Sequence, residues 1–322
     1  MRPSYFRRLR GPLVVLLMLA LHGTAHAGGA PPWTFPLDAP AVSPAPLRVS
    51  VYLPPGYAPH RGRRYPVLYA NDGQDMDAVD LSGTLAALYR ERTIRPVIVV
   101  AVDMPADRAD AYGLSDRAMG RSVVGGSRIG PIGSHAQDYS AWFATQLVPW
   151  VDAHYRTQAT PRGRSLLGWS LGALNAFNLA WEYPELFGRG GAFSPSFWLA
   201  GDRTDARRIQ HTRLAQAMAD RGPPRKGLAF WFAVGGAEES GDRDGEGVID
   251  AVDDLDDLVE GYRDGDGFRT RGLRQLGYTV AIDPAPSARR ADVTLVHWQD
   301  GQHNQATWKR MLPPFLRRAY GR

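Results

Sequence analysis

Cysteine is absent from this 322-residue sequence. The chain can therefore form no disulfide and no thiolate metal site, and a cysteine nucleophile or a lipid anchor on an N-terminal cysteine is excluded. Lysine is nearly absent as well, because only Lys226 and Lys309 are found among 38 basic residues. We interpret this as a composition bias and not as a phosphate-binding signal. The fold must be held by a hydrophobic core, and a chain of this length can bury a large one.

Long apolar runs are also scarce, and the single one lies near the N-terminus at 11–23. Four arginines precede it and Ala25-His26-Ala27 follows it, a pattern typical of a secretory signal with a small-residue cleavage site. We predict that residues 1–27 are a signal peptide and that the protein is exported, to the periplasm or beyond the cell. No later run is long enough to span a membrane, so we expect no membrane span.

The chain that remains after cleavage lacks an excess of charge of either sign. The four basic residues of the segment 1–27 are lost with it, which leaves 34 basic residues against 33 acidic ones. This balance gives no reason to expect a nucleic-acid partner.

The remaining sequence alternates short apolar runs with amphipathic helical patterns. We predict strands at 47–54, 65–71, 95–103, 164–169, 188–194, 228–236, 278–282 and 292–298. We predict helices at 81–91, 136–155, 171–183, 205–220, 268–276 and 305–320. This alternation favours an α/β fold with a mostly parallel central sheet and helices on both faces.

The domain organisation follows from composition. Residues 28–46 are rich in proline, alanine and glycine and are expected to form an exposed leader. One domain over 47–322 accounts for the rest; a division near residue 200 is conceivable, but no linker-like segment supports it.

The segment Gly168-Trp169-Ser170-Leu171-Gly172 has the form G-x-S-x-G. The motif alone occurs by chance in small-residue loops, but here an apolar strand pattern precedes it and a helical pattern follows. A tight strand-to-helix turn of this kind exposes the serine hydroxyl and directs the first helical N–H groups at whatever lies above. We therefore predict Ser170 as a nucleophile in an α/β-hydrolase fold, with the N–H of Leu171 binding a developing oxyanion.

A neutral serine needs a general base, and in this fold the acid and then the histidine follow the serine along the chain. Three histidines follow Ser170. His211 lies in a polar helical pattern and is expected at the surface, whereas His297 lies within a strand pattern, where packing is the commoner role. His303 stands in a loop after the last strand and is the predicted base.

The acid is expected where a late strand ends. The run "AFWFAVGG" is followed by Glu238 and Glu239, of which Glu238 is preferred and Glu239 is the alternate. The second oxyanion donor is expected in the loop after an early strand, and the N–H of Gln74 follows the turn Asn71-Asp72-Gly73. We interpret Asp72 as a turn-capping residue.

Taken together, these segments resemble the putative esterase family of α/β-hydrolases, which includes enterochelin-esterase-like, feruloyl-esterase-like and mycolyltransferase-like proteins. The resemblance runs from about 48 to 320 and rests on "RVSVYLPPGY", "YPVLYANDGQ", "GWSLGALNAF", "AFSPSFW" and "GQHNQATWKRMLPPFLRRAYG". Ala173 departs from the second glycine that many members carry after the motif.

The resemblance implies a triad of Ser170, His303 and Glu238, and backbone donors at Gln74 and Leu171. It also implies that Trp198 and the loop 103–113 lie near the substrate. Within that loop we predict Asp103, Arg108 and Tyr112 as substrate-binding residues, because they follow a strand on the side of the sheet where ligands bind.

An acidic segment at 242–253 has ligand spacing typical of a calcium loop. Its oxygen ligands fall at alternate positions, and an aspartate replaces the usual final glutamate; the predicted ligands are Asp242, Asp244, Glu246, Asp250 and Asp253. A structural Ca²⁺ is therefore predicted beside the catalytic acid, with a solvated acidic insertion as the alternative. No cofactor is expected for catalysis.

The sequence thus predicts an exported serine hydrolase that cleaves a carboxylic ester of a small molecule or a glycan through an acyl-enzyme. Two alternatives are an acyltransferase with the same triad and a calcium-dependent binding protein on an inactive hydrolase scaffold.

Overall fold

The computed structural model describes residues 31–59, 62–104, 108–285 and 291–322. The predicted signal peptide, 1–27, lies outside these residues. Among the described helices, none combines the length and the apolar character that crossing a membrane requires.

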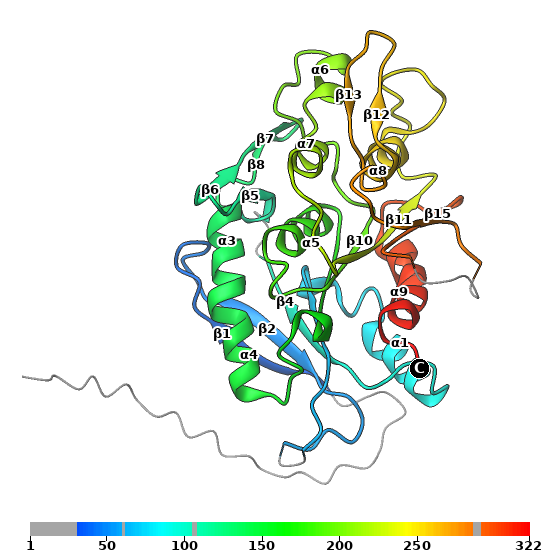
Figure 1. Ribbon diagram of the computed structural model, residues 1–322. Helices are drawn as coiled ribbons and strands as arrows, with labels where there is room; N and C mark the ends of the chain where they lie inside the picture. The colour runs from blue at the N-terminus through cyan, green and yellow to red at the C-terminus, as the bar shows by residue number, and fades with distance from the viewer. Residues whose placement is uncertain (1–30, 60–61, 105–107, 286–290) are drawn as a thin grey trace, which may run out of the picture.

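A nine-stranded sheet forms the centre of the described chain (Figure 1). In spatial order its strands are β1 (Trp33–Leu37), β2 (Leu47–Tyr52), β4 (Ile98–Val102), β3 (Val67–Ala70), β9 (Arg164–Trp169), β10 (Arg189–Phe193), β11 (Ala229–Gly235), β15 (Val293–Trp298) and β14 (Val280–Ile282). β2 pairs antiparallel with β1 and β4, and all the other pairs are parallel. The predicted mostly parallel sheet is confirmed.

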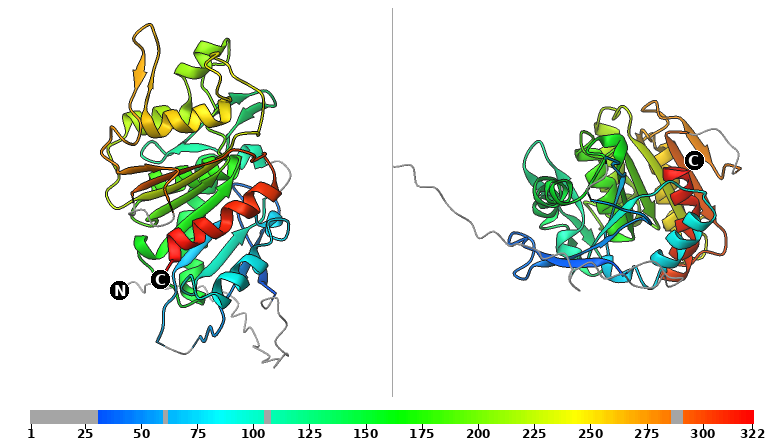
Figure 2. Two further views of the ribbon diagram at one scale, coloured as in Figure 1. Left: turned by 90° about the vertical axis from the view of Figure 1, so that its right-hand side faces the viewer. Right: turned by 90° about the horizontal axis from the view of Figure 1, so that it is seen from below.

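Helices cover both faces of this sheet (Figure 2). On one face lie α1 (Leu81–Arg90) and α9 (Gln305–Tyr320), whose apolar residues share a core with alternate residues of the strands. The other face carries α3 (Ala136–Trp142), the π-helical turn η2 (Phe143–Leu147), α4 (Val148–His154), α5 (Leu171–Glu182), α7 (Leu214–Arg221) and α8 (Asp250–Glu260). Every residue of α5 except Glu182 is buried or nearly so, which fixes the start of this helix firmly against the sheet.

Smaller elements stand over the carboxyl ends of the parallel strands. They are η1 (Gly73–Asp75), α2 (Arg108–Ala111), β5 (Leu114–Asp116), β6 (Arg121–Val123), β7 (Gly125–Ser127), β8 (Gly130–Ile132), α6 (Ala206–His211), β12 (Tyr262–Arg263) and β13 (Arg269–Thr270); η3 (Pro161–Gly163) precedes β9. β5–β6, β7–β8 and β12–β13 are each a two-stranded antiparallel pair.

The eight predicted strands are all present, but the predicted leader, 28–46, is wrong over residues 33–37. Residues Trp33–Leu37 form β1 and pair with β2, so that Leu37 lies opposite Leu47. The sheet edge therefore begins inside the proline-rich segment. Phe35 stacks on Trp150 of α4, with ring centroids 4.1 Å apart, and this contact supplies an apolar surface that composition does not indicate.

Two predicted helices are also corrected. The helix expected at 205–220 is divided into α6 and α7, because the N–H of Leu214 bonds the carbonyl of Leu199 and draws the backbone out of the helix. The helix expected at 268–276 is absent from that stretch of the described chain, where β13 and turns occur instead. Gly272 lies directly on the backbone of Gly261 there, since a Cβ on Gly272 would be 2.2 Å from the Gly261 nitrogen.

The sheet has a switch point between β3 and β9. The connection after β3 returns to β4 on one side, whereas the connection after β9 leads to β10 on the other. In open α/β sheets the crevice at such a point, beyond the carboxyl ends of the strands, is where ligands bind. The loops that follow β3 and β9 both open into this crevice.

Candidate active site

Ser170 occupies a strained turn between β9 and α5. Its backbone has φ 55° and ψ −126°, a conformation that residues with a side chain rarely adopt. Its N–H bonds the carbonyl of Phe193 at 3.1 Å, and its own carbonyl accepts from Ser196 at 3.2 Å. Ser170 is partly exposed although all of β9 and the start of α5 are buried. The strand, turn and helix predicted around the G-x-S-x-G motif are therefore present, with the serine at the one accessible point.

The two glycines of the motif are required by close backbone contacts. A Cβ on Gly168 would lie 2.1 Å from the carbonyl oxygen of Gly172. A Cβ on Gly172 would lie 2.3 Å from Oδ2 of Asp72, which belongs to the loop after β3. The sequence motif thus reports two contacts, one within the turn and one between the turn and its neighbouring loop.

Glu238 and His303 are joined by a hydrogen bond. Nδ1 of His303 lies 2.8 Å from Oε2 of Glu238, and Oε1 of Glu238 accepts from the N–H of Gly235 at 2.6 Å. The Glu238 side chain is 2% exposed and that of His303 is 38% exposed. The carboxylate is thus buried and oriented, while the histidine ring reaches solvent with Nε2 free for another partner.

The loops that carry these two residues are packed backbone against backbone. The N–H of Ala237 donates to the carbonyl of Gly301 at 2.9 Å, and a Cβ on Gly235 would be 2.2 Å from that same oxygen. Only glycine at both positions permits this approach. The contact between the ends of β11 and β15 therefore decides which of the two adjacent glutamates meets His303.

Trp308 connects His303 to the nucleophile turn. Its ring lies edge-on to His303 with centroids 5.4 Å apart, and it stacks on Trp169 at 5.5 Å. Its Nε1 donates to Ser194 at 2.9 Å. Trp169 immediately precedes Ser170, so the two indole rings connect the His303 ring with the turn that carries Ser170. Within the described chain no hydrogen bond joins His303 to Ser170; such contacts commonly tighten only when substrate is bound.

The two predicted oxyanion donors lie on either side of the switch point. Leu171 is the first residue of α5, and its N–H has no acceptor in the helix. Gln74 lies in η1, with its side chain held by Asp72 Oδ1 (3.1 Å) and by the N–H of Met104 (3.1 Å). In the described residues neither backbone N–H has an acceptor, so both are available to an oxyanion.

Sequence reasoning missed how the loop after β3 is anchored. Nδ2 of Asn71 donates to the carbonyl of Gly172 at 2.8 Å, and Oδ1 of Asn71 accepts from Tyr139 at 2.9 Å. Asp72 is fully buried and accepts from Arg108 at 2.8 and 2.9 Å. Burial raises the pKa of Asp72 to about 6, and the Arg108 charge opposes that rise. These side chains fix the Gln74 loop to the first turn of α5.

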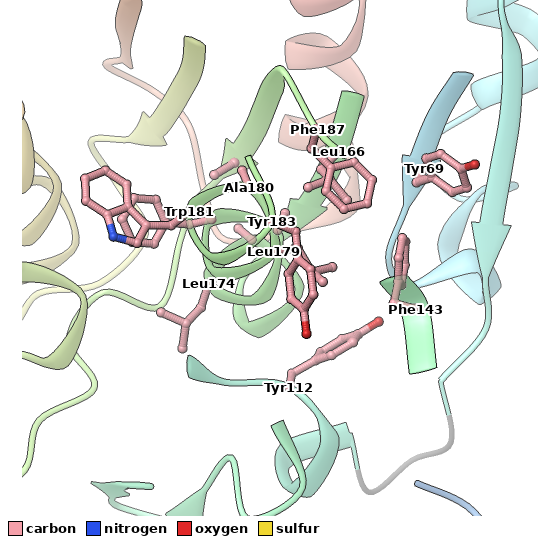
Figure 3. Packing of buried hydrophobic residues seen from close by; sticks show 14 of the residues in the cluster. Tyr69, Tyr112, Phe143, Leu166, Leu174, Leu179, Ala180, Trp181, Tyr183 and Phe187 are labelled. Atoms are coloured by element: carbon pink, nitrogen blue, oxygen red, sulfur yellow. The ribbon is translucent and has the colours of Figure 1, made fainter. Parts of the chain in front are cut away.

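Three residues predicted to bind substrate have structural partners instead. Tyr112 is fully buried, and its ring lies among the buried side chains near Tyr183 (Figure 3). It packs edge-on against Tyr139 and accepts from the N–H of Asp72, so it cannot touch substrate. Arg108 is bound to Asp72, and Asp103 forms an ion pair with Arg48 at 3.2 Å. The prediction is wrong for Tyr112, because this residue follows the short helix α2 and its side chain is buried in the core. Arg108 and Asp103 keep partly exposed side chains beside the oxyanion loop.

Trp198 and Glu239 line a pocket, and along the chain they follow closely after Ser196 and Glu238. Trp198 is half-buried and lies two residues after Ser196, whose Oγ is 3.5 Å from Oγ of Ser170. Glu239 directly follows the acid that holds His303. The pocket has a volume of about 490 Å³. Glu239 is thus placed away from the His303 ring.

The other two histidines after Ser170 are held by carboxylates. His297 in β15 has both ring nitrogens occupied, with Nδ1 2.8 Å from Asp283 and Nε2 2.9 Å from Asp256. His211 bonds Asp264 at 2.7 Å and stacks on Phe268, so the expectation that it lies at the surface is wrong. Both ring nitrogens of His297 and Nε2 of His211 are thus bound to carboxylates.

His297 makes stability depend on pH. The hydrogen bonds to Asp256 and Asp283 raise its pKa to about 9 against burial, above its value of about 6.5 when unfolded. The stabilisation is complete below pH 6.5 and is lost as pH rises through 9. We expect His297→Gln to lower the free energy of unfolding by about 1–2 kcal/mol at pH 6, discounted because both carboxylates are partly exposed, and by much less at pH 10.

Urea unfolding of the parent and the variant at both pH values measures this difference. His135→Gln is the matched control, because His135 forms a single exposed ion pair with Asp138. An equal loss at pH 6 and pH 10 would show that His297 acts only through packing.

The predicted calcium loop is only partly assembled. Asp244, Glu246 and Asp253 bring carboxylate oxygens within 4.8 Å of one another. Asp242 instead caps the N–H groups of residues 245–247, and Asp250 bonds Arg243 at the start of α8. The five-ligand set is therefore wrong, because α8 begins at Asp250 and turns the last positions of the supposed loop into helix. Calcium binding by the remaining three stays a prediction.

Comparison with known proteins relates this chain to a family of esterases. The model of a family described as "Putative esterase" matches residues 42–254. An esterase of Mycobacterium tuberculosis is 31% identical over 180 residues, which is 54% of this chain and 34% of that protein. The chain spans about half the length of the first curated relatives it matches.

Solved structures show the same fold at low identity. The enterobactin esterase of Shigella flexneri in the presence of enterobactin matches with a TM-score of 0.63 and 15% identity, covering 91% of this chain and 60% of that one. A ferulic acid esterase matches with a TM-score of 0.61 and 15% identity, covering 91% and 100%. With a family match over most of its length and this shared architecture, the chain belongs to the putative esterase family of α/β-hydrolases.

Proposed function

We propose that this protein is an exported serine esterase that hydrolyses carboxylic esters of a small molecule or a glycan. The observation that carries the proposal is the oriented Glu238–His303 pair beside a strained, accessible Ser170. The family relationship and relatives named as esterases support it. Export rests on the signal sequence alone.

The reaction follows from the geometry. Nε2 of His303 accepts the Ser170 proton while Oγ attacks the ester carbonyl, and Glu238 stabilises the imidazolium through Nδ1. The N–H groups of Gln74 and Leu171 receive the oxyanion, each worth on the order of 3 kcal/mol of barrier. His303 then protonates the leaving alcohol. Water, deprotonated by the same histidine, attacks the acyl-enzyme. The tetrahedral intermediate then releases the acid as His303 returns the proton to Oγ of Ser170, which leaves His303 neutral again.

The first experiment is hydrolysis of p-nitrophenyl esters, from acetate to octanoate, by the chain without residues 1–27. We expect release of both nitrophenol and free acid in equal amounts with no added acceptor. Activity that requires an acceptor alcohol or sugar would instead indicate the acyltransferase alternative. No activity on any chain length, by a protein that is folded by circular dichroism, would contradict the esterase proposal for simple esters.

The two adjacent glutamates provide a matched pair. We expect Glu238→Gln to lower kcat by about 10²- to 10⁴-fold, because an amide stabilises the imidazolium less and no longer fixes the ring tautomer. Glu239→Gln, one residue further along, should change kcat less than about threefold on a neutral ester, because that side chain does not touch His303. The two kcat values, measured on p-nitrophenyl butyrate, check this. Equal losses would mean that the loop, and not the carboxylate, determines the rate.

A further inference from the structure

A charged pocket opens beside the proposed triad. It is lined by the tip between β7 and β8, by Trp198 and Arg203, by α6, and by Glu239 with Arg243. The backbone ties these walls together: the N–H of Gly126 bonds the carbonyl of Ala200 at 2.9 Å. Figure 1 shows the β7–β8 pair alongside α7, with α6 above. Two lining residues of the pocket are thus close along the chain to the proposed site: Trp198 is two residues after Ser196, and Glu239 directly follows Glu238.

Two arginines of this pocket have no acidic partner. Arg203 donates to the carbonyl of Trp198 at 3.3 Å and forms no ion pair with any described residue. Arg128 is exposed at the β7–β8 tip and likewise pairs with no carboxylate of the described chain. Burial lowers the pKa of Arg203, and the positive charges of Arg128 and Arg243 lower it further, whereas Asp254 and Asp250 oppose this change.

The other charged residues of the pocket are Asp205, Glu239, Arg243 and Asp250. Arg243 bonds Asp254 and forms an ion pair with Asp250, so it contributes little free charge. Asp205 caps α6 by accepting from the N–H of Arg208 at 2.7 Å. Burial raises the pKa of Glu239, and the neighbouring Asp250 adds to that rise. Glu239 lies on the side of Asp250, because a Cβ on Gly241 would be 3.1 Å from Oδ2 of Asp250 and 3.4 Å from Oε2 of Glu239. Among the described residues, the charges near β7–β8 and α6 that have no ion-pair partner are therefore two arginines, Arg128 and Arg203, against one aspartate, Asp205.

The same pocket offers apolar surface next to these cations. Ile129 is 80% exposed at the hairpin tip, and Trp198 and Ile209 form part of the lining. The Arg203 guanidinium lies 6.0 Å from the centre of the Trp198 ring. A flat or aliphatic group could contact these side chains while an anionic oxygen receives N–H groups from Arg128 and Arg203.

We propose that this pocket is a specificity site for an anionic group of the ester, a carboxylate or similar oxyanion remote from the scissile bond and joined to it by an apolar body. The inference rests on the proposed esterase function and names its substrate class. Because the anionic group is bound both before and during reaction, its effect should be on KM more than on kcat.

The kinetic test compares esters of equal length that differ in one charge. For the acyl side, mono-p-nitrophenyl adipate carries the negative charge and p-nitrophenyl hexanoate is its neutral partner. For the alcohol side, 4-carboxyphenyl acetate carries the charge and phenyl acetate is its neutral partner. In one of the two pairs, we expect the anionic ester to have a kcat/KM at least tenfold above that of its neutral partner at low salt, and a lower KM. Arg203→Gln should reduce that preference about tenfold and Arg128→Gln about three- to tenfold, mainly through a higher KM for the anionic ester.

Arg207→Gln is the matched control, since Arg207 lies in α6, four residues after Arg203, but is paired with Asp266 at 2.7 Å. It should keep the preference. If neither anionic ester is preferred, or the preference survives both Arg203→Gln and Arg128→Gln, the proposal is wrong.

A binding measurement separates this proposal from the proposed activity. Titration calorimetry of the Ser170→Ala protein with 2-naphthoate and with the neutral 2-naphthamide needs no catalysis. We expect binding of naphthoate to be at least tenfold tighter, with the difference removed by Arg203→Gln. If the protein binds naphthoate but hydrolyses no ester, the esterase proposal is wrong and the proposal of an anion-binding pocket stands. If naphthoate and naphthamide bind with equal affinity, the proposal of an anion-binding pocket is wrong.

Discussion

Ser170→Ala should lower kcat for p-nitrophenyl butyrate by about 10⁴- to 10⁶-fold, leaving the residual rate that oxyanion binding alone supports. Ser170 is partly exposed, whereas the neighbouring Ser196, whose Oγ lies 3.5 Å away, is buried, so we expect it not to replace Ser170 at the carbonyl carbon. Steady-state hydrolysis and covalent labelling by a fluorophosphonate probe measure the effect: the parent should label once, and the variant should not.

Two controls sharpen this result. Ser134→Ala removes an exposed hydroxyl that bonds Asp110 and should leave hydrolysis and labelling unchanged. Ser170→Gly should be equally inactive yet more stable than the parent by about 1 kcal/mol, because glycine adopts φ 55° without strain. A Ser170→Ala protein that keeps more than a tenth of the parent activity would mean that another nucleophile acts.

Arg213→Met should lower the free energy of unfolding by about 3–5 kcal/mol, because it leaves buried carboxylates without their cation. The Arg213 side chain is 1% exposed, lies 2.6 Å from Asp254 and also bonds Asp257. Burial lowers the pKa of Arg213, but these two aspartates raise it by more, so the net shift is upward. Urea unfolding at pH 7 measures the loss.

The pH dependence of this variant distinguishes charge from packing. Without the arginine, the folded-state pKa of Asp254 and Asp257 is expected to rise further above its unfolded value, because burial already raises both. The stability of the variant relative to the parent should then fall as pH rises from 5 to 8. Arg207→Met removes an arginine that is 59% exposed and should change stability by less than about 1 kcal/mol. A pH-independent loss in Arg213→Met would indicate lost packing alone.

The family match and the site geometry support different residues of the proposed triad. The matched segment, 42–254, contains Ser170, Gln74 and Glu238 but ends before His303 and α9. The base is therefore assigned by its place after β15 and by its hydrogen bond to Glu238, which family membership over 42–254 does not supply. For this reason the Glu238 and Glu239 pair is the more informative test of the proposed triad.

What the sequence determined by itself is local. The apolar run before Ser170 and the helical pattern after it specify a strand and a helix, because continuous apolar residues and a 3.6-residue period report how a segment is buried. Gly168 and Gly172 required a close approach, and the order of Ser170 and His303 along the chain limited the choice of base. The strand, the turn and the helix depend on neighbours within a few residues, and all three are present in the structure as expected.

Only the tertiary structure decided what depends on contacts between distant segments. Glu238 rather than Glu239 meets His303 because Gly235 and Gly301 let two loops touch. Likewise Tyr112 turns into the core under Asp72, and the acidic segment near Asp250 becomes the start of a helix. Neither propensity nor spacing encodes such pairings, since each is fixed by the packing of the whole sheet and its helices.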